Sequence, residues 1–516
     1  MVTAIRQWHG LPARALKIVF GAVVLGLISA TAVNAAPKPK AEPADKSPEA
    51  EYYKKIEIPI PADVKLECGG LEWLPGGKLA VGTRRGDIYI VEGVLEDPPT
   101  HVKFTKWATG LHEILGLAYN KKDGYLYACQ RPEVTRLKDT DGRGHANVYE
   151  TFCDGWGISG DYHEYAMMSK FDKEGDLWVT LTLTGSFTSE APFRGWCVRI
   201  KPDGTMVPTA SGLRSPGGVG FNEKGEVFYS ENQGPWNGAD ALRHIEVGNF
   251  QGHPIGNKWY KLAPNMGEQV PDPTSGSRIY IEAAKDPKLV PPAIIQPYGK
   301  VGQSQSGIAC DMSDGKFGPF EHQMFCGDQH HSNIARFVLQ TVKGRYQGVC
   351  IPFREGFVSG VLPMIQAADG SIVVGETNRG WGSAGPKQFA LERVVWTGKV
   401  PFEIYNMELT HDGFDLTFTE PLDTASASNL DNYKMSTYRY IYQASYGSPE
   451  VDQTTPAIKS AKVSADRLKV HIVVDGLQQG AVHELHIPNV HSADGKPLLH
   501  PVAYYTLWQF VDGDKK

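Results

Sequence analysis

The stretch SKFDKEGDLWVTL, residues 169–181, is one copy of a phrase that recurs along the chain. An apolar run enters a turn that contains glycine, and a β-rich run follows, which is the pattern of a β-hairpin. The other copies are LEWLPGGKLAVGT (71–83), LAYNKKDGYLYACQ (117–130), VGFNEKGEVFYSE (219–231) and IQAADGSIVVGET (365–377), with a weaker one around Asp314-Gly315. Repetition of this kind predicts an architecture built from repeated sheets.

The turn glycines of these copies set the length of one unit. Their spacings along the chain are 47, 51, 50, 90 and 55 residues, for Gly77, Gly124, Gly175, Gly225, Gly315 and Gly370. A unit of about 50 residues matches the four-stranded blade of a β-propeller. The interval of 90 holds a blade and an insertion, which we place at residues 252–297. The sequence therefore predicts an all-β fold with a six-bladed β-propeller over residues 55–398, or seven blades if the insertion hides a degenerate one.

The pattern changes after Gly398. Short strand-like runs separated by turns continue to the end, and they predict a fibronectin/Ig-like β-sandwich over residues 401–510. Its most unusual stretch is the tyrosine-rich TYRYIYQASYGSPEVD, residues 437–452. That stretch is either a surface for a partner or a carbohydrate, or a segment that packs against the propeller.

The first residues carry the features of a secretory signal peptide. A basic start precedes a short apolar run at residues 18–28, and Val33-Asn34-Ala35 is a small-residue cleavage site. We therefore predict a signal peptide at residues 1–35, a disordered linker at 36–54, and a secreted or periplasmic protein. An uncleaved anchor is the alternative, although the run is shorter than the ~20 residues that span a bilayer. The sequence predicts no stable membrane span in the mature chain.

Charge and cysteine content narrow the function classes. The net charge is −6 and no long basic run occurs, which argues against a nucleic-acid partner. Seven cysteines remain after the signal peptide. In an exported protein some are expected to pair, with at least one left over, and buried free thiols are the alternative.

One loop has the spacing of a calcium site. In DTDGRGHANVYE, residues 139–150, oxygen-bearing side chains fall at positions one, three, nine and twelve of a twelve-residue calcium loop. The candidate ligands are Asp139, Asp141, the backbone carbonyl of His145, Asn147 and Glu150. Arg143 stands at position five, where an acidic or amide side chain is usual. The alternative is an exposed acidic turn.

Polar residues at the blades predict a second site. Residues just before an innermost propeller strand line the central funnel, so we expect Arg131, His163 and Arg214 to converge there. One imidazole with several guanidinium groups suits an anionic ligand or a hydride-accepting cofactor that carries carboxylates.

At these residues the chain resembles the glucose/sorbosone dehydrogenase family. The resemblance is carried by YHEYAMMSKFDKEGDLWVTL (162–181) with GLRSPGGVGFNEKGEVFYSENQGP (212–235) and GADALRHIEVGNFQGHP (238–254). The last blade, with the sandwich after it, resembles a planctomycete-type exported branch. The resemblance implies a six-bladed propeller that uses pyrroloquinoline quinone (PQQ) and calcium to oxidise a sugar or polyol, and a possible redox partner.

The resemblance also implies roles for single residues. His163 falls at the place of the base that takes the hydroxyl proton, and a neutral imidazole suits that role. Arg214 matches an arginine over the cofactor, and Glu231, Asn232 and Asp240 match polar residues after the next strand. Arg379 is a candidate anion contact from the last blade.

The chain departs from the family pattern at two places. It reads Arg214-Ser215-Pro216-Gly217-Gly218 where the family has Arg-Asn-Pro-Gln-Gly, and Thr182-Leu183 where Gly-Asp is usual. Two alternatives therefore stay open beside the dehydrogenase. One is a non-catalytic extracellular propeller that binds a glycan or a protein. The other is a quinone-independent propeller lyase that uses His163 with Tyr162 or Tyr165.

Overall fold

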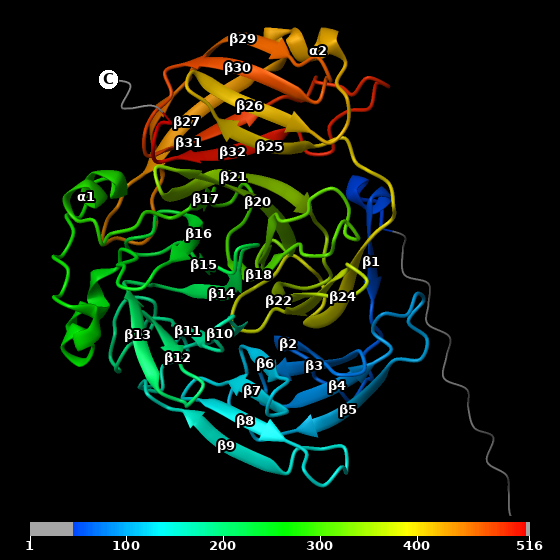
Figure 1. Ribbon diagram of the computed structural model, residues 1–516, viewed down its shortest axis with the longest axis vertical. Helices are drawn as coiled ribbons and strands as arrows, with labels where there is room; N and C mark the ends of the chain where they lie inside the picture. Colours follow the sequence, from blue (N-terminus) through cyan, green and yellow to red (C-terminus); the bar gives the residue numbers. More distant parts are fainter. Residues whose placement is uncertain (1–44, 512–516) are drawn as a thin grey trace, which may run out of the picture. The chain divides into compact units, whose positions relative to one another are not determined.

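The computed structural model describes residues 45–511, so the predicted signal peptide at residues 1–35 lies outside the described residues. Its first large unit is a ring of six antiparallel four-stranded blades (Figure 1). Blades 1 to 3 consist of β2 (Cys68–Leu74), β3 (Lys78–Thr83), β4 (Ile88–Glu92) and β5 (Lys103–Ala108); β6 (Leu117–Asn120), β7 (Tyr125–Cys129), β8 (Val134–Lys138) and β9 (Val148–Cys153); and β10 (Ala166–Phe171), β11 (Leu177–Leu181), β12 (Trp196–Ile200) and β13 (Met206–Ser211).

The other three blades complete the ring. They consist of β14 (Pro216–Phe221), β15 (Val227–Glu231), β16 (Asp240–Ile245) and β17 (Ile294–Gln296); β18 (Gln305–Cys310), β19 (Met324–Asp328), β20 (Asn333–Val342) and β21 (Arg345–Arg354); and β22 (Val361–Gln366), β23 (Ile372–Thr377), β24 (Phe389–Trp396) and β1 (Tyr53–Glu57). The innermost strands β2, β6, β10, β14, β18 and β22 each contact the next, and β22 contacts β2. The predicted six-bladed propeller is therefore confirmed.

The N-terminal segment closes the ring. Strand β1 pairs antiparallel with β24, with Ile56 opposite Arg393, and so supplies the outer strand of blade 6. A short 3-10 helix, η1 (Pro48–Glu51), precedes it. The predicted disordered linker is therefore wrong for residues 45–54. The polar composition of this segment predicts disorder, but the segment also contains Tyr53, which is buried against the rings of Phe317 and Phe353.

The insertion lies inside blade 4, between β16 and β17, in the predicted region. It holds two 3-10 helices, η2 (Pro254–Leu262) and η3 (Pro264–Met266), and the helix α1 (Ile279–Lys285). Because it contributes no further four-stranded sheet, the seven-blade alternative is wrong.

The C-terminal segment forms the predicted β-sandwich. One sheet has the order β25 (Ile404–Leu409), β26 (Gly413–Phe418), β30 (Lys469–Asp475) and β29 (Ala457–Val463). The other has the order β32 (Val502–Leu507), β31 (Ala481–His486), β27 (Lys434–Tyr440) and β28 (Glu450–Thr454), and two short helices, α2 (Thr424–Ser428) and η4 (Leu430–Asn432), accompany them.

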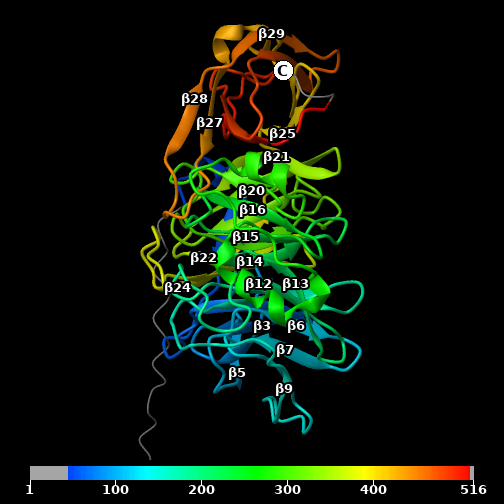
Figure 2. The ribbon, with the colours of Figure 1, turned by 90° about the vertical axis from the view of Figure 1, so that its left-hand side faces the viewer.

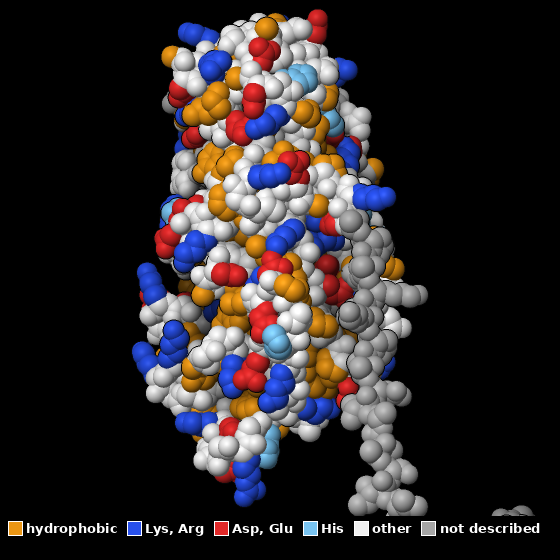
Figure 3. Space-filling view, turned by 90° about the vertical axis from the view of Figure 1, so that its right-hand side faces the viewer, with side chains coloured by type: hydrophobic (Ala, Val, Ile, Leu, Met, Phe, Trp, Pro, Cys, Tyr) orange, Lys and Arg blue, Asp and Glu red, His pale blue; other side chains and the backbone are white. Residues whose placement is uncertain are grey.

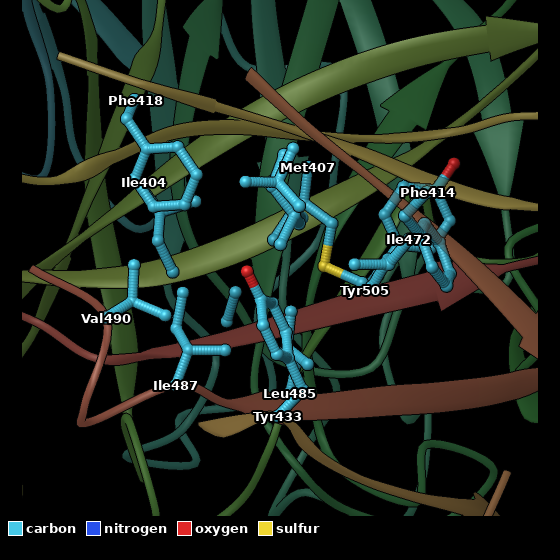
Figure 4. Close-up of a cluster of buried hydrophobic side chains, with 14 of the residues drawn as sticks. Ile404, Met407, Phe414, Phe418, Tyr433, Ile472, Leu485, Ile487, Val490 and Tyr505 are labelled. Carbon is cyan, nitrogen blue, oxygen red and sulfur yellow. The ribbon is translucent and has the colours of Figure 1, made fainter. Parts of the chain in front are cut away.

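The sandwich shares a sheet with the propeller. Strand β32 pairs with β21, the outer strand of blade 5, so that blade 5 and half of the sandwich form one eight-stranded sheet. Side chains of β21, Val349 and Ile351, join the sandwich core with Met407, Phe414 and Tyr505 (Figure 4). Because these side chains are buried between the domains, the two domains are fixed to each other at this strand.

The tyrosine-rich stretch packs against the propeller. The loop between β27 and β28 receives a backbone hydrogen bond from Trp236 N to Gln443 O (2.7 Å) and donates one from Gly447 N to Gly234 O (3.0 Å). The hydroxyl of Tyr442 donates to the carbonyl of Gly252. Figure 2 shows β27 and β28 reaching from the sandwich to the edge of the propeller. The packing against the propeller that was one of the two alternatives for this stretch is therefore observed.

The remaining sequence predictions concern cysteines and surface. All seven cysteines are free, and burial raises the pKa of the thiols, that of Cys68 to about 12. On the face drawn in Figure 3, acidic and basic side chains are interspersed. Within residues 45–511, no helix has the length and apolarity needed to cross a membrane.

Candidate functional site

One face of the propeller holds a cavity of about 360 Å³. Its wall comes from two kinds of segment, the residues that lead into the innermost strands and the residues that follow the second strands. The first kind includes Tyr162, His163, Arg214, Ser215 and Gln303, and the second includes Arg84, Phe187, Asn232, Gln329 and Trp381. Because every blade repeats this geometry, residues far apart in the sequence meet around one axis.

His163 enters the cavity from the loop before β10. The carboxylate of Asp161 accepts hydrogen bonds from the backbone N–H of His163 (2.8 Å) and of Gly185 (2.9 Å), which fixes the loop. The imidazole Nδ1 lies 2.7 Å from the carbonyl oxygen of Leu183, and Nε2 lies 3.2 Å from Oγ of Ser215. Since a carbonyl only accepts, Nδ1 carries the proton and Nε2 presents a lone pair.

The surroundings of His163 keep the imidazole neutral. Burial, followed by the positive charge of Arg214, lowers its pKa to about 4. The ring is therefore unprotonated at neutral pH, and its Nε2 is a hydrogen-bond acceptor next to Ser215. This arrangement can take a proton from a hydroxyl group placed in the cavity.

Arg214 is the most unusual charge at the site. The side chain is 5% exposed, yet within residues 45–511 it has no ion-pair partner, and its Nε has no hydrogen-bond partner. The ring of Tyr446 lies over the guanidinium, 5.2 Å from its carbon. Glu231 and Asp240 interact with this charge only from beyond ion-pair distance. A buried charge without a close partner is costly, and an anionic ligand in the cavity would compensate for it.

Three predicted residues lie around Arg214. The carboxylate of Glu231 accepts from the backbone N–H of Arg214 (3.0 Å) and of Ser215, so it positions that turn from behind. Asn232 lines the cavity, and its side-chain nitrogen donates to the Ser215 carbonyl (2.9 Å), while its side-chain oxygen has no partner. Asp240 is fully buried behind the wall, where burial and then the charge of Asp328 raise its pKa well above the usual range.

Arg131 and Arg379 support the site without lining it. Arg131 bonds to Glu113 (2.6 Å) and to the carbonyl oxygens of Asp161 and Tyr162, so it holds the loop that carries His163. Arg379 was predicted to contact an anion of the ligand. Its guanidinium instead pairs with the carboxylate of Glu67 (3.1 Å). Of the three residues predicted to converge, His163 and Arg214 line the cavity and Arg131 does not.

The buried carboxylate of Glu113 joins several arginines below the cavity. It accepts from Arg84 and from Arg131, and these cations hold its pKa below the usual range although burial alone would raise it. The ring of Tyr165 lies between the two guanidinium groups, 5.0 and 4.9 Å from their carbons. Arg84 follows the second strand of blade 1 just as Arg131 follows that of blade 2, so the repeat itself was the signal for Arg84.

Aromatic rings surround the mouth of the cavity. Among large hydrophobic side chains of residues 45–511, the exposed aromatic ones are Tyr149, Tyr162, Phe187, Trp381 and Tyr446, and all except Tyr149 line this cavity. Such a concentration of exposed rings at one place marks a binding surface. Sequence reasoning missed Tyr446, which comes from the sandwich.

A second cavity of about 270 Å³ lies between the innermost strands. Its wall is mostly glycine and apolar side chains. Lys170 at its edge is engaged with Glu72 (2.7 Å) and with backbone carbonyls. It offers little chemistry compared with the cavity at His163.

The predicted calcium loop lies between β8 and β9, on the outer strands of blade 2, with Glu150 inside β9. Its polar side chains are engaged within the protein: Asp139 accepts from the N–H of Gly142 (2.7 Å) and Gly144 (2.9 Å), Asp141 faces Arg143 (3.4 Å), Asn147 accepts from the N–H of Thr140 (2.8 Å), and Glu150 pairs with Arg136 (2.7 Å). His145 lies among exposed turn residues. In the described part of the chain, no group of three or more His, Cys, Asp or Glu side chains is placed to hold a metal ion. The three candidate carboxylates, Asp139, Asp141 and Glu150, therefore do not form such a group.

Comparison with known proteins adds one family match. Residues 89–310 match DUF7133, a domain of unknown function. No curated protein matches the chain.

Several solved structures are similar to about two thirds of the chain. They include a putative oxidoreductase (glucose dehydrogenase) of Thermus thermophilus, at 19% identity over 66% of this chain and 100% of that one, with a TM-score of 0.48. The PQQ-bound aldose sugar dehydrogenase of Streptomyces coelicolor matches at 17% over 66% and 98%, with a TM-score of 0.44. The PQQ domain of pyranose dehydrogenase from Coprinopsis cinerea matches at 12% over 68% and 98%, with a TM-score of 0.46.

Proposed function

We propose that the protein is an exported dehydrogenase that oxidises a sugar or polyol, with PQQ as the hydride acceptor. The observation that carries the proposal is a neutral imidazole in the wall of a cavity, beside a buried guanidinium that has no ion-pair partner among residues 45–511. A base and an anion site in one cavity are what this reaction requires of the protein.

His163 performs the proton transfer. Its Nδ1–H donates to the Leu183 carbonyl, so Nε2 points its lone pair toward the cavity and takes the proton of the substrate hydroxyl. Without substrate, the hydroxyl of Ser215, whose Oγ lies 3.2 Å from Nε2, is hydrogen-bonded to this lone pair. The substrate hydroxyl replaces the Ser215 hydroxyl there when it binds. Asp161 and Arg131 hold the loop, and so keep the ring at a fixed place.

The residues present fit PQQ by charge and size. Arg214 offers an unpaired guanidinium, the amide oxygen of Asn232 has no partner, and Tyr446 gives a flat wall beside them. The guanidinium of Arg214 would hold a carboxylate of the cofactor, and the ring of Tyr446 would lie against its ring system, in the cavity of about 360 Å³. The Asn232 oxygen is an acceptor, so it would suit an N–H of the cofactor rather than a carboxylate. When bound, PQQ supplies an ortho-quinone that accepts hydride from the carbon bearing the hydroxyl. We assign no residue to calcium, because the loop proposed for it holds no gathered ligand set.

The test is reconstitution of the purified protein. Addition of PQQ with Ca²⁺ is expected to shift the quinone absorbance and to give sugar-dependent reduction of a dye. His163→Ala is expected to keep the absorbance shift and lose the turnover. No cofactor retention and no dye reduction across aldoses, sorbosone and polyols would refute the proposal.

The same cavity supports a second candidate, a lyase that needs no quinone. Arg214 would neutralise the carboxylate of an acidic sugar, His163 would remove the proton next to it, and Tyr162 or Tyr165, both in the cavity wall, would protonate the leaving group. Turnover of a uronate-containing glycan without any electron acceptor would favour this candidate. A non-catalytic binding protein would show ligand binding that His163→Ala leaves unchanged, and no turnover.

A further inference from the structure

A second hollow adjoins the cavity at Phe187. This groove, of about 470 Å³, is lined by Phe187, Pro235, Trp236, His253, Pro254, Ile255, Asn257, Lys258, Gln269, Asp272 and Ala444. Phe187 also lines the cavity that holds His163. The two hollows therefore lie side by side, with Phe187 in the wall of both.

The groove is built from parts outside the repeated blades. Its floor is the start of η2 in the insertion of blade 4, and its edge is the loop between β27 and β28 of the sandwich. Within that loop, Ala444 lies in the groove and Tyr446 lies in the cavity, where its ring centroid is 6.1 Å from that of Phe187. One loop of the sandwich therefore lines both hollows.

Two buried polar residues of the groove have atoms without partners. His253 is 4% exposed, and its Nδ1 accepts from the N–H of Ile255 (3.3 Å), so its Nε2 carries the proton and has no acceptor. Asn257 is 2% exposed, and its side-chain oxygen has no donor. Both atoms are buried within residues that line the groove. An unused donor and an unused acceptor behind one wall suit a ligand whose hydroxyl groups both donate and accept.

The backbone at the junction is held in an uncommon conformation. Ser186, next to Phe187, has φ 72°, and Trp236 has φ 61°, although neither residue is glycine. The loop of the sandwich fixes the second of these through the hydrogen bond from Trp236 N to Gln443 O. Such conformations persist where the surroundings impose them, and they concentrate at ligand sites.

The side chains that line the groove indicate which class of ligand it can bind. Exposed apolar faces, Phe187 and Ile255, stand beside polar atoms, and the one lysine and one aspartate, Lys258 and Asp272, balance in charge. A neutral chain of sugar rings presents alternating apolar faces and hydroxyl groups, which matches this wall. A strongly charged polymer does not match it.

We propose that the groove is a second sugar subsite and that the substrate is therefore a neutral oligosaccharide, oxidised at the unit that enters the cavity. The oxidation of the oligosaccharide rests on the proposed function, whereas its binding in the groove does not. The sandwich is then a part of the binding site, because its loop forms one edge of the groove and one wall of the cavity.

The test measures glycan binding by the purified protein without cofactor. Isothermal titration compares maltotriose, cellotriose, xylotriose and mannotriose with glucose, xylose and mannose. We expect at least one trisaccharide to bind about tenfold more tightly than its monosaccharide, the gain of one or two net hydrogen bonds. Ala444→Arg, which places a large side chain in the groove, is expected to reduce that ratio to about one.

A matched pair of variants separates the groove from a general surface effect. Ile255 in the groove and Ile281 on α1 are each 40% exposed, so Ile255→Ala is expected to weaken trisaccharide binding and Ile281→Ala to leave it unchanged. Equal binding of every trisaccharide and its monosaccharide, or a ratio that Ala444→Arg does not change, overturns the proposal. Glycan binding that follows this pattern without dye reduction would refute the dehydrogenase instead, so the two failures are distinguishable.

Discussion

His500 lies buried between two carboxylates that come from distant parts of the chain. Its Nδ1 contacts Glu403, and its Nε2 lies 3.4 Å from Glu49 of η1, which in turn lies 4.0 Å from Arg354 of blade 5. The N-terminal segment, the sandwich and the propeller therefore meet at one imidazolium. Although burial opposes the charge, Glu403 and Glu49 raise the pKa of His500 to about 9.

The size of the effect follows from the pKa difference. The ordinary value is 6.5 and the folded value about 9, so the charged ring contributes on the order of 3 kcal/mol to the free energy of unfolding. Because the folded pKa is the higher one, this contribution is complete below about pH 6.5 and is lost as the pH rises through 9. The pKa of Glu49 is lowered to about 2, so at the acid end stability is lost as the pH falls from 4.5 toward 2.

Replacement of His500 by glutamine is expected to destabilise the protein by roughly 3 kcal/mol at pH 6 and to remove the decline between pH 6.5 and 9. The assay is denaturant unfolding at pH 6, 7.5 and 9, with the exposed His411→Gln as the control. A wild-type free energy of unfolding that stays flat over this range would show that His500 is neutral in the folded protein. An identical slope in His500→Gln would refute the assignment to this residue.

Three further predictions concern the cavity. His163→Ala is expected to reduce kcat about 10²- to 10⁴-fold while PQQ still binds. Steady-state kinetics measure kcat and the quinone absorbance measures PQQ binding, and persistent turnover in this variant would contradict the prediction. Arg214→Gln removes the second cause of the lowered pKa of His163, so that pKa is expected to rise above about 4 but stay below 6.5, because burial remains; NMR titration of the imidazole measures it, and an unchanged value would be contrary evidence. Tyr446→Ala is expected to weaken the retention of PQQ, measured by the quinone absorbance, whereas Tyr446→Phe retains the ring and the wild-type affinity; equal effects of the two variants would exclude a role of the ring face.

The sequence determined the blades and the two residues at the centre of the cavity. Each blade begins with a hairpin of adjacent strands, so its signal is local, and the phrase around residues 169–181 repeats it at a nearly constant interval. His163 and Arg214 were found because they stand at equivalent places, just before the innermost strands β10 and β14. The insertion was visible as a doubled interval, for the same reason.

Tertiary structure decided how the repeat closes and what completes the site. Tyr53 lies in the outer strand of blade 6, more than 300 residues from its partner Trp396, and no local pattern indicates that pairing. The calcium spacing in residues 139–150 could not show that Glu150 lies in a strand and pairs with Arg136.

The arginines show the same limit at the site itself. Arg131, Arg214 and Arg379 are all candidate ligand contacts from the sequence, yet Arg131 pairs with Glu113 and Arg379 with Glu67. Arg214 has no ion-pair partner among residues 45–511. Tyr446 reaches the cavity from a different domain. Partner choice and burial depend on which loops meet across the ring, and that is a property of the folded chain rather than of any one segment.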